Sequence, residues 1–169
     1  MYVFDATPLI YLAKVGAPEP TVRATGECYI PELVYGEVVE TGIGEGHADA
    51  RRVQRATEED LFNRESVSDE RTFSRLSENP KLSEADAAVL TMTKELNGIA
   101  VMDERYGRAV ANAEGIPTRG TAFLVLNAIR EETMTREEAR ATIDAMVDAG
   151  WYVSPSMYTK IVEKIDELR

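Results

Sequence analysis

Short apolar runs alternate along the chain with segments whose apolar residues recur at helical spacing. One run covers residues 2–4 and is followed at once by Asp5, and another covers residues 99–102 and is followed by Asp103. Short apolar runs bounded by turn residues are typical of buried strands. The alternation predicts an α/β fold with a mostly parallel sheet. Because the carboxyl ends of parallel strands share one edge, where ligands usually bind, we expect the two aspartates to meet there.

Periodicity and capping residues predict the remaining elements. Thr7 as cap and Pro8 in the first turn start the first helix, and Gly16-Ala17-Pro18 stops it. Residues 41–47 contain three glycines and are predicted to form a flexible connector. The other predicted strands cover residues 27–30, 65–67 and 116–118; another helix starts at residue 31, and further helices cover residues 48–57, 69–77, 83–96, 104–113, 121–131, 135–148 and 155–168.

The length of 169 residues and the hydrophobic content of 44% favour one domain with a substantial core. We expect a core of about residues 1–130 and a helical extension of about residues 131–169, in which Trp151, Tyr152 and Val153 bury considerable area. No apolar run approaches the roughly 20 residues of a membrane helix, and a signal peptide is not evident. We therefore expect a cytoplasmic protein without a membrane partner.

The net charge of −11 argues against a basic surface that binds nucleic acid by neutralising phosphates. It does not exclude an enzyme that acts on nucleic acid. Only five of the 19 basic residues are lysines, which fits either a host that lives in high salt or an ordinary acidic protein. The single cysteine, Cys28, excludes an intrachain disulfide, and we expect it to be a small buried hydrophobe.

Four acidic residues, Asp5, Glu37, Asp86 and Asp103, are the strongest candidates for chemistry. Mg²⁺ and Mn²⁺ prefer oxygen ligands, so acids without nearby histidine or cysteine fit such an ion. Two ions could activate water and stabilise the leaving oxygen of a phosphodiester. Each acid also has a structural alternative: Asp5 could begin a turn, Glu37 could be solvated, and Asp103 could cap a helix.

Asp86 has a structural alternative of its own, because Ser83 and Asp86 have the spacing of a capping box. The positive side chains of Arg105 and Arg108, and of Arg51, Arg52 and Arg55, could guide a phosphate backbone or could be solvated. His47 is the only histidine, which leaves no partner for a zinc site and no support for serine catalysis.

The sequence resembles the PIN-domain nucleases, including VapC-type toxins of toxin and antitoxin pairs, in particular a subgroup with a C-terminal helical extension. The resemblance lies in residues 3–10, 31–38, 83–88 and 101–105, each around one of the four acids, and continues in Gly120-Thr121 and residues 150–154. It implies a three-layer α/β/α sandwich, cleavage of RNA with Mg²⁺ or Mn²⁺, and an antitoxin protein and a second copy of the chain as partners.

The resemblance also implies roles for single residues. Asp5, Glu37, Asp86 and Asp103 take the catalytic acidic positions, with Asp5, Asp86 and Asp103 as metal ligands. The secondary candidates are Thr7 beside the first acid, Glu84 as a rival of Asp86, Glu104 as an outer ligand, and Thr121.

Two other classes of function stay open at this stage. The segment Asp5-Ala6-Thr7 resembles the opening of haloacid-dehalogenase-type phosphatases, but Thr7 stands where that motif has its second aspartate. A PIN-fold binding module without catalysis is the other alternative. The target RNA has no signature in the sequence.

Overall fold

The computed structural model describes residues 1–16 and 18–168 and contains a five-stranded sheet. The strand order is β3-β2-β1-β4-β5, and every neighbouring pair is parallel. The α/β prediction is therefore confirmed, with β2, β3 and β5 shifted by one or two residues from their predicted positions. The strands are β1 (Tyr2–Phe4), β2 (Cys28–Pro31), β3 (Asn63–Glu65), β4 (Ile99–Val101) and β5 (Thr118–Arg119).

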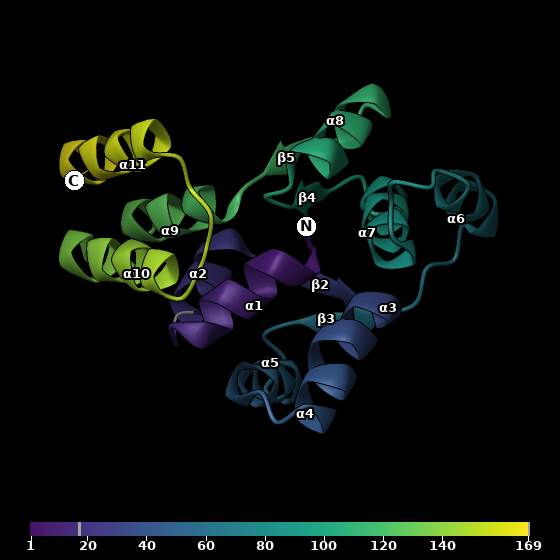
Figure 1. Ribbon diagram of the computed structural model, residues 1–169, viewed down its shortest axis with the longest axis horizontal. Coiled ribbons are helices and arrows are strands. Elements are labelled where there is room, and N and C mark those ends of the chain that lie inside the picture. Colours follow the sequence, from purple (N-terminus) through teal and green to yellow (C-terminus); the bar gives the residue numbers. More distant parts are fainter. Residues whose placement is uncertain (17, 169) are drawn as a thin grey trace.

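Helices cover both faces of this sheet, which makes a three-layer α/β/α sandwich (Figure 1). On one face α7 (Glu84–Glu95) packs on β1, β2 and β4, and α6 (Glu70–Ser77) lies outside it. The other face carries α1 (Ala6–Lys14), α2 (Pro18–Thr25), α5 (Ala48–Glu58) and α9 (Thr121–Arg130), while α8 (Arg105–Ala113) lies beside β5.

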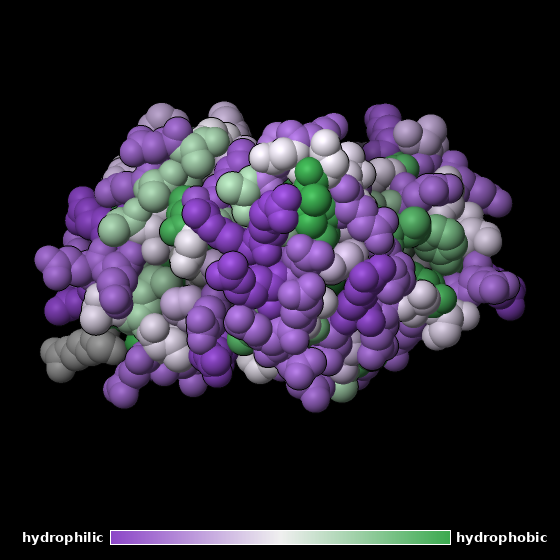
Figure 2. Space-filling model, turned by 90° about the horizontal axis from the view of Figure 1, so that it is seen from below, coloured by the Kyte–Doolittle hydropathy of each residue, from purple (hydrophilic) through white to green (hydrophobic). Residues whose placement is uncertain are grey.

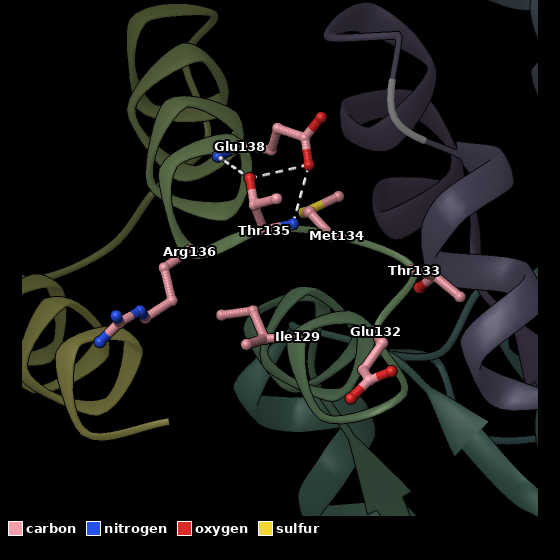
Figure 3. Close-up of a pocket in the computed structure, with 7 residues that line it drawn as sticks. All are labelled: Ile129, Glu132, Thr133, Met134, Thr135, Arg136 and Glu138. Atoms are coloured by element: carbon pink, nitrogen blue, oxygen red, sulfur yellow. Dashed lines mark hydrogen bonds between the residues drawn. The ribbon is translucent and has the colours of Figure 1, made fainter. Parts of the chain in front are cut away.

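The two C-terminal helices extend the second face. Helix α10 (Arg136–Asp148) packs on α9 and α1, and α11 (Pro155–Glu167) packs on α9 and α10. A capping box starts α10: the Thr135 backbone N–H donates to Glu138 over 2.7 Å, and the Glu138 N–H donates to the Thr135 hydroxyl over 3.2 Å. Figure 3 shows this turn, which lines a cavity of about 310 Å³ between α9 and α10.

The core lies on both sides of the sheet. Phe4, Ile30 and Leu90 are among the largest side chains that are completely buried, and the ring of Phe4 meets Phe62 edge to face at 5.3 Å between ring centres. Cys28 is buried, as predicted. Strands buried on both faces explain why the sequence shows continuous apolar runs there and no alternation.

Three local predictions are wrong. The cap of α1 is Asp5 and not Thr7. Helix α2 was not predicted, because Pro18 and Pro20 resemble a loop, yet both lie in a first turn, where a missing N–H breaks no helical hydrogen bond. Ala17, part of the predicted stop between α1 and α2, lies outside the described residues. The third error is the predicted flexible connector.

Residues of that connector continue a helix. Helix α3 (Glu32–Tyr35) runs through a π-helical stretch η1 (Gly36–Thr41) into α4 (Gly42–Gly44). A Cβ atom on Gly42 would lie 2.7 Å from the Cβ atom of Ala50, so glycine lets α4 approach α5 closely. The glycine at position 42 therefore serves packing, where the sequence suggested flexibility.

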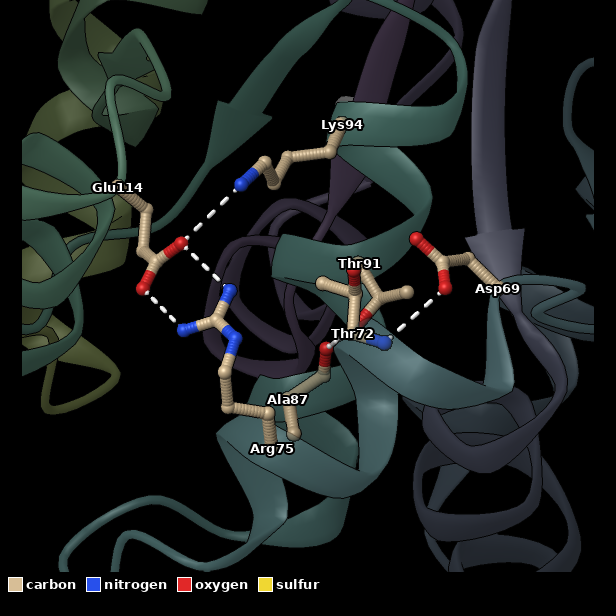
Figure 4. Close-up of polar contacts among 7 residues, drawn as sticks. All are labelled: Asp69, Thr72, Arg75, Ala87, Thr91, Lys94 and Glu114. Atoms are coloured by element: carbon tan, nitrogen blue, oxygen red, sulfur yellow. Dashed lines mark hydrogen bonds and ion pairs between the residues drawn. The ribbon is translucent and has the colours of Figure 1, made fainter.

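A polar network joins three helices on the other side of the molecule (Figure 4). Arg75 of α6 donates to Glu114 at the end of α8 over 2.7 and 2.9 Å, and Lys94 of α7 donates to the same carboxylate over 3.1 Å. The hydrogen bond from Arg75, followed by that from Lys94, lowers the pKa of Glu114 to about 2.

The surface seen from below in Figure 2 is mainly hydrophilic, and apolar side chains form small separate groups on it. In the described part of the chain, no helix is both long and apolar enough to span a bilayer. Trp151 is buried, as predicted, but Tyr152, predicted to be buried beside it, is 89% exposed.

Candidate active site

Asp5 lies at the carboxyl end of the central strand. Its backbone N–H donates to the Val101 carbonyl over 3.0 Å, so the residue is tied to the end of β4. Its carboxylate accepts the N–H of Ala6 over 2.8 Å and caps α1. Only 5% of Asp5 is exposed. The strand end and the helix start together fix this acid, so the structural role weighed from sequence is also present.

Two other acids act on Asp5. Asp86 comes from the first turn of α7, where its carboxylate accepts the Ser83 N–H over 3.1 Å and completes a capping box. Glu37 comes from the π-helical stretch η1. Burial, the negative charge of Asp86, a hydrogen bond with Asp86 and the charge of Glu37 together raise the pKa of Asp5 to about 7, against the lowering effect of the hydrogen bond from the Ala6 N–H. Asp86 and Glu37 therefore both lie near enough to Asp5 for their charges to affect its pKa.

Asp103 follows β4. It is not the cap of the next helix, which was its structural alternative, because Glu104 is the N-cap of α8. Its Oδ1 accepts the backbone N–H of Thr121 over 2.7 Å, and its Oδ2 accepts the Thr121 hydroxyl over 2.6 Å and the Trp151 indole N–H over 3.1 Å. Thr121 was a candidate from sequence. The contact with Trp151 was not predicted, since an indole 48 residues away leaves no local signal.

A cavity of about 560 Å³ opens beside Asp103. It brings together several predicted residues from α1 and from the start of α8, and it adds two tyrosines that sequence reasoning missed. The residues that line it are Thr7, Tyr11, Asp103, Glu104, Arg105, Gly150, Trp151 and Tyr152.

Other candidates lie in less favourable places. Glu84 is exposed at the first position of α7 and is not among the groups that shift the pKa of Asp5. Arg108 is exposed, with its guanidinium close to Gly120. Arg52 donates to the carbonyls of Ala13 and Lys14 over 2.6 and 3.0 Å, so it closes the end of α1 and is not free to guide a substrate.

Comparisons with known proteins identify the family of this chain. The sequence profile of the family DUF3368, described as a PIN domain, matches residues 1–167. The chain belongs to the PIN-domain family. This family generally includes metal-dependent nucleases. No curated protein sequence matched the chain.

A similar fold occurs in a solved structure. The crystal structure of the protein PAE2754 from Pyrobaculum aerophilum matches with a TM-score of 0.53 and 17% sequence identity, over 79% of this PIN-domain chain and 97% of that protein. At this level of identity the likeness concerns the fold alone.

The donor set of this PIN domain suits Mg²⁺ or Mn²⁺, and its charge supports such an ion. Among the described residues, no three His, Cys, Asp or Glu side chains lie close enough together to hold an ion as they stand. Mg²⁺, however, keeps several waters and takes as few as one or two protein carboxylates. Asp5 and Asp86 can supply two such carboxylates, and the negative charge of Asp86 contributes to the raised pKa of the buried Asp5.

Proposed function

We propose that this PIN-domain chain is a metal-dependent endoribonuclease that hydrolyses phosphodiester bonds of RNA. The observation that carries the proposal is the uncompensated charge around the buried Asp5. Across residues 1–16 and 18–168, none of the ion pairs involves Asp5, Glu37, Asp86 or Asp103. A group of acids that repel one another and lack a protein cation is suited to bind a divalent ion and phosphate oxygens.

Each residue has a role in this proposal. Asp5, Asp86 and Asp103 would hold the metal, and Glu37 would take part from the exposed side. Bound Mg²⁺ or Mn²⁺ supplies an activated water and stabilises negative charge on the phosphate. Thr7 lies beside Asp5 and faces the cavity with Asp103, where its hydroxyl can hold a water or a phosphate oxygen.

Because the protein carries a net charge of −11, an RNA substrate can approach the site only where positive side chains lie beside it. Arg105 lines the cavity and Arg108 is exposed one helical turn later. These two guanidiniums are the means by which a molecule of net charge −11 can attract a polyanion. Glu104, at the cavity wall, limits that attraction and can act as an outer ligand.

The first experiment compares cleavage of RNA and DNA oligonucleotides of the same sequence, with Mg²⁺, with Mn²⁺ and after EDTA treatment. We expect metal-dependent cleavage of RNA, lowered by orders of magnitude in Asp86→Asn. Glu84→Gln is the matched control, since it removes an exposed acid two residues away, and it should cleave as wild type does. A loss of cleavage in Glu84→Gln with normal cleavage in Asp86→Asn would transfer the role to Glu84.

The same experiment separates the alternatives. Cleavage that survives EDTA would overturn a metal-dependent mechanism. Hydrolysis of p-nitrophenyl phosphate without cleavage of RNA would favour a phosphatase. Binding of Mn²⁺ without any cleavage would favour a binding module that keeps the fold.

We further propose that the enzyme acts in the cytoplasm as the toxin of a toxin–antitoxin pair, as a homodimer that is held inactive by an antitoxin protein. Expression of the wild-type chain in a bacterial host should stop growth, whereas Asp5→Asn should not. The product of a neighbouring reading frame should restore growth and bind the wild-type chain. Unimpaired growth in cells that contain active enzyme would contradict the toxin role and leave the ribonuclease activity intact.

A further inference from the structure

The carboxylate of Asp103 has little capacity left for a ligand. An ionised carboxylate oxygen can accept about two hydrogen bonds. Among the described residues, Oδ2 already accepts the Thr121 hydroxyl and the Trp151 indole N–H, while Oδ1 accepts a single hydrogen bond, from the Thr121 backbone N–H. A ligand of Asp103 must therefore approach Oδ1.

The residue beside Oδ1 keeps that approach clear. Gly120 has a φ of −93°, a value that any residue can adopt, so its conformation does not require glycine. A Cβ atom at this position would lie 3.0 Å from Asp103 Oδ1 and 3.3 Å from the Arg108 guanidinium. Both neighbours would be crowded by any side chain. Glycine at position 120 thus leaves room at the oxygen that is still available.

The position of Trp151 is fixed from both sides by the chain. Helix α10 ends in a tight turn in which Gly150 has a φ of +103° and the Trp151 backbone N–H donates to the Met146 carbonyl over 2.9 Å. Three residues later Ser154 caps α11 by accepting the N–H of Met157 over 3.2 Å. Trp151 is 7% exposed, so the loss of its acceptor would leave a largely buried indole N–H without its hydrogen-bond partner.

We propose that Trp151 is a positioning residue of the acidic site. Its indole N–H holds Oδ2 of Asp103, which turns Oδ1 toward the ligand, and so the C-terminal helical extension completes a site otherwise built from the sheet edge. The inference rests on the proposed metal-dependent function of Asp103. Side chains that orient a metal ligand typically change metal affinity or activity by about 10–100-fold when they are removed.

The decisive variant is Trp151→Phe, which keeps an aromatic ring and removes the N–H donor. Thr121→Val removes the second donor to Oδ2 and keeps the backbone donor to Oδ1. For both we expect the Mn²⁺ concentration that gives half of the thermal shift to rise about tenfold or more. We expect kcat to fall with KM for RNA nearly unchanged, because the indole N–H is already engaged by Asp103 Oδ2.

Tyr158→Phe is the matched control. It removes another hydroxyl donor to a carboxylate, that of Asp144, within the same two C-terminal helices and away from Asp103. It should change the melting temperature in EDTA but not the Mn²⁺ requirement. If Trp151→Phe and Thr121→Val behave like this control, with lower melting temperatures and the Mn²⁺ requirement of wild type, Trp151 has a structural role only and the inference is wrong.

A spectroscopic measurement separates this inference from the proposed function. Trp151 is the only tryptophan of the chain, so the emission reports on the surroundings of Asp103. Paramagnetic Mn²⁺ bound there should quench the emission, and excess Mg²⁺ should restore it. Quenching without cleavage of RNA would support the inference and refute the ribonuclease. Mn²⁺-dependent cleavage with unquenched emission would leave the ribonuclease standing and overturn the inference.

Discussion

Replacing Asp5 by asparagine should stabilise the metal-free protein while it abolishes cleavage. The amide oxygen of asparagine can still accept the Ala6 N–H, so the cap of α1 is kept. What disappears is a negative charge that is buried and lies beside Asp86 and Glu37. Because none of the ion pairs among the described residues involves Asp5, this substitution removes repulsion where most buried substitutions remove attraction.

The size of the effect follows from the pKa of Asp5, which rises from 3.8 to about 7 on folding. Between these values the native state holds a proton that the unfolded chain releases, so wild type loses stability as the pH rises from about 4 to 7. At 1.36 kcal/mol per pKa unit, the loss reaches about 2 kcal/mol at pH 5 and about 4 kcal/mol at pH 8. Side chains and solvent relax around the charge and screen part of this loss of stability, so we expect about half of the loss calculated at each pH.

Urea unfolding in EDTA at pH 5 and pH 8 measures this difference. The gain in unfolding free energy of Asp5→Asn over wild type should be larger at pH 8 by about 1–2 kcal/mol, and Mn²⁺ should stabilise wild type only. Asp148→Asn is the control, because it removes an exposed charge and should change stability by less than about 0.5 kcal/mol at either pH. A gain that is equal at both pH values, or a loss at pH 8, would refute the argument that buried charge destabilises this site.

Three further predictions concern the surrounding fold. Ser83→Ala should lower the unfolding free energy by about 0.5–2 kcal/mol and leave cleavage unchanged, whereas Asp86→Asn should abolish cleavage. If Asp86→Asn lowers the unfolding free energy as Ser83→Ala does and also leaves cleavage unchanged, Asp86 is purely structural. The pKa of Glu114 is lowered to about 2, so the stability that its ionised form contributes is complete above about pH 4.5 and is lost as the pH falls through 2. Glu114→Gln should therefore lower the unfolding free energy by about 1 kcal/mol at pH 7 and flatten the acid-unfolding curve between about pH 4.5 and 2. Gly42→Ala should destabilise by about 1–3 kcal/mol through its close contact with α5, while Gly44→Ala, with open space around it, should be neutral or stabilising by up to about 1 kcal/mol; thermal unfolding that ranks the two glycine variants in the opposite order would contradict the packing argument.

The fold could be predicted from sequence where one physical signal dominates. Apolar runs predict the buried strands and a capping box predicts the start of helix α7, and the structure contains these elements. Helix α2, and the continuation of the predicted helix through Thr41 into α4, were missed because Pro18 and Gly42 are common in loops. Here Pro18 is tolerated because it lies in a first turn, and Gly42 is required by the close packing of α4 on α5. Such tolerance depends on neighbours that are distant in sequence.

For the site, sequence placed the residues at strand and helix ends but not their contacts. That Asp5 lies beside Asp86 follows from the parallel arrangement of strands and from helix α7 over the sheet. That Trp151 reaches Asp103 follows from the turn at Gly150, whose outcome depends on how α10 packs. Tyr152 was predicted to be buried and is exposed, because the irregular connection between α10 and α11 buries Trp151 and leaves its neighbour in solvent.

The order of the strands also bears on when activity can arise during synthesis. Strand β1 is central in the sheet, but its neighbour β4 is made about a hundred residues later, and Trp151 follows still later. Asp5 therefore emerges from the ribosome long before Asp103 and the indole that holds it. We expect nascent chains arrested with Trp151 still inside the ribosomal tunnel to leave RNA intact, and chains with all residues outside it to cut. A ribonuclease built in this way would spare the messenger that encodes it until the segment that contains Trp151 has left the ribosome.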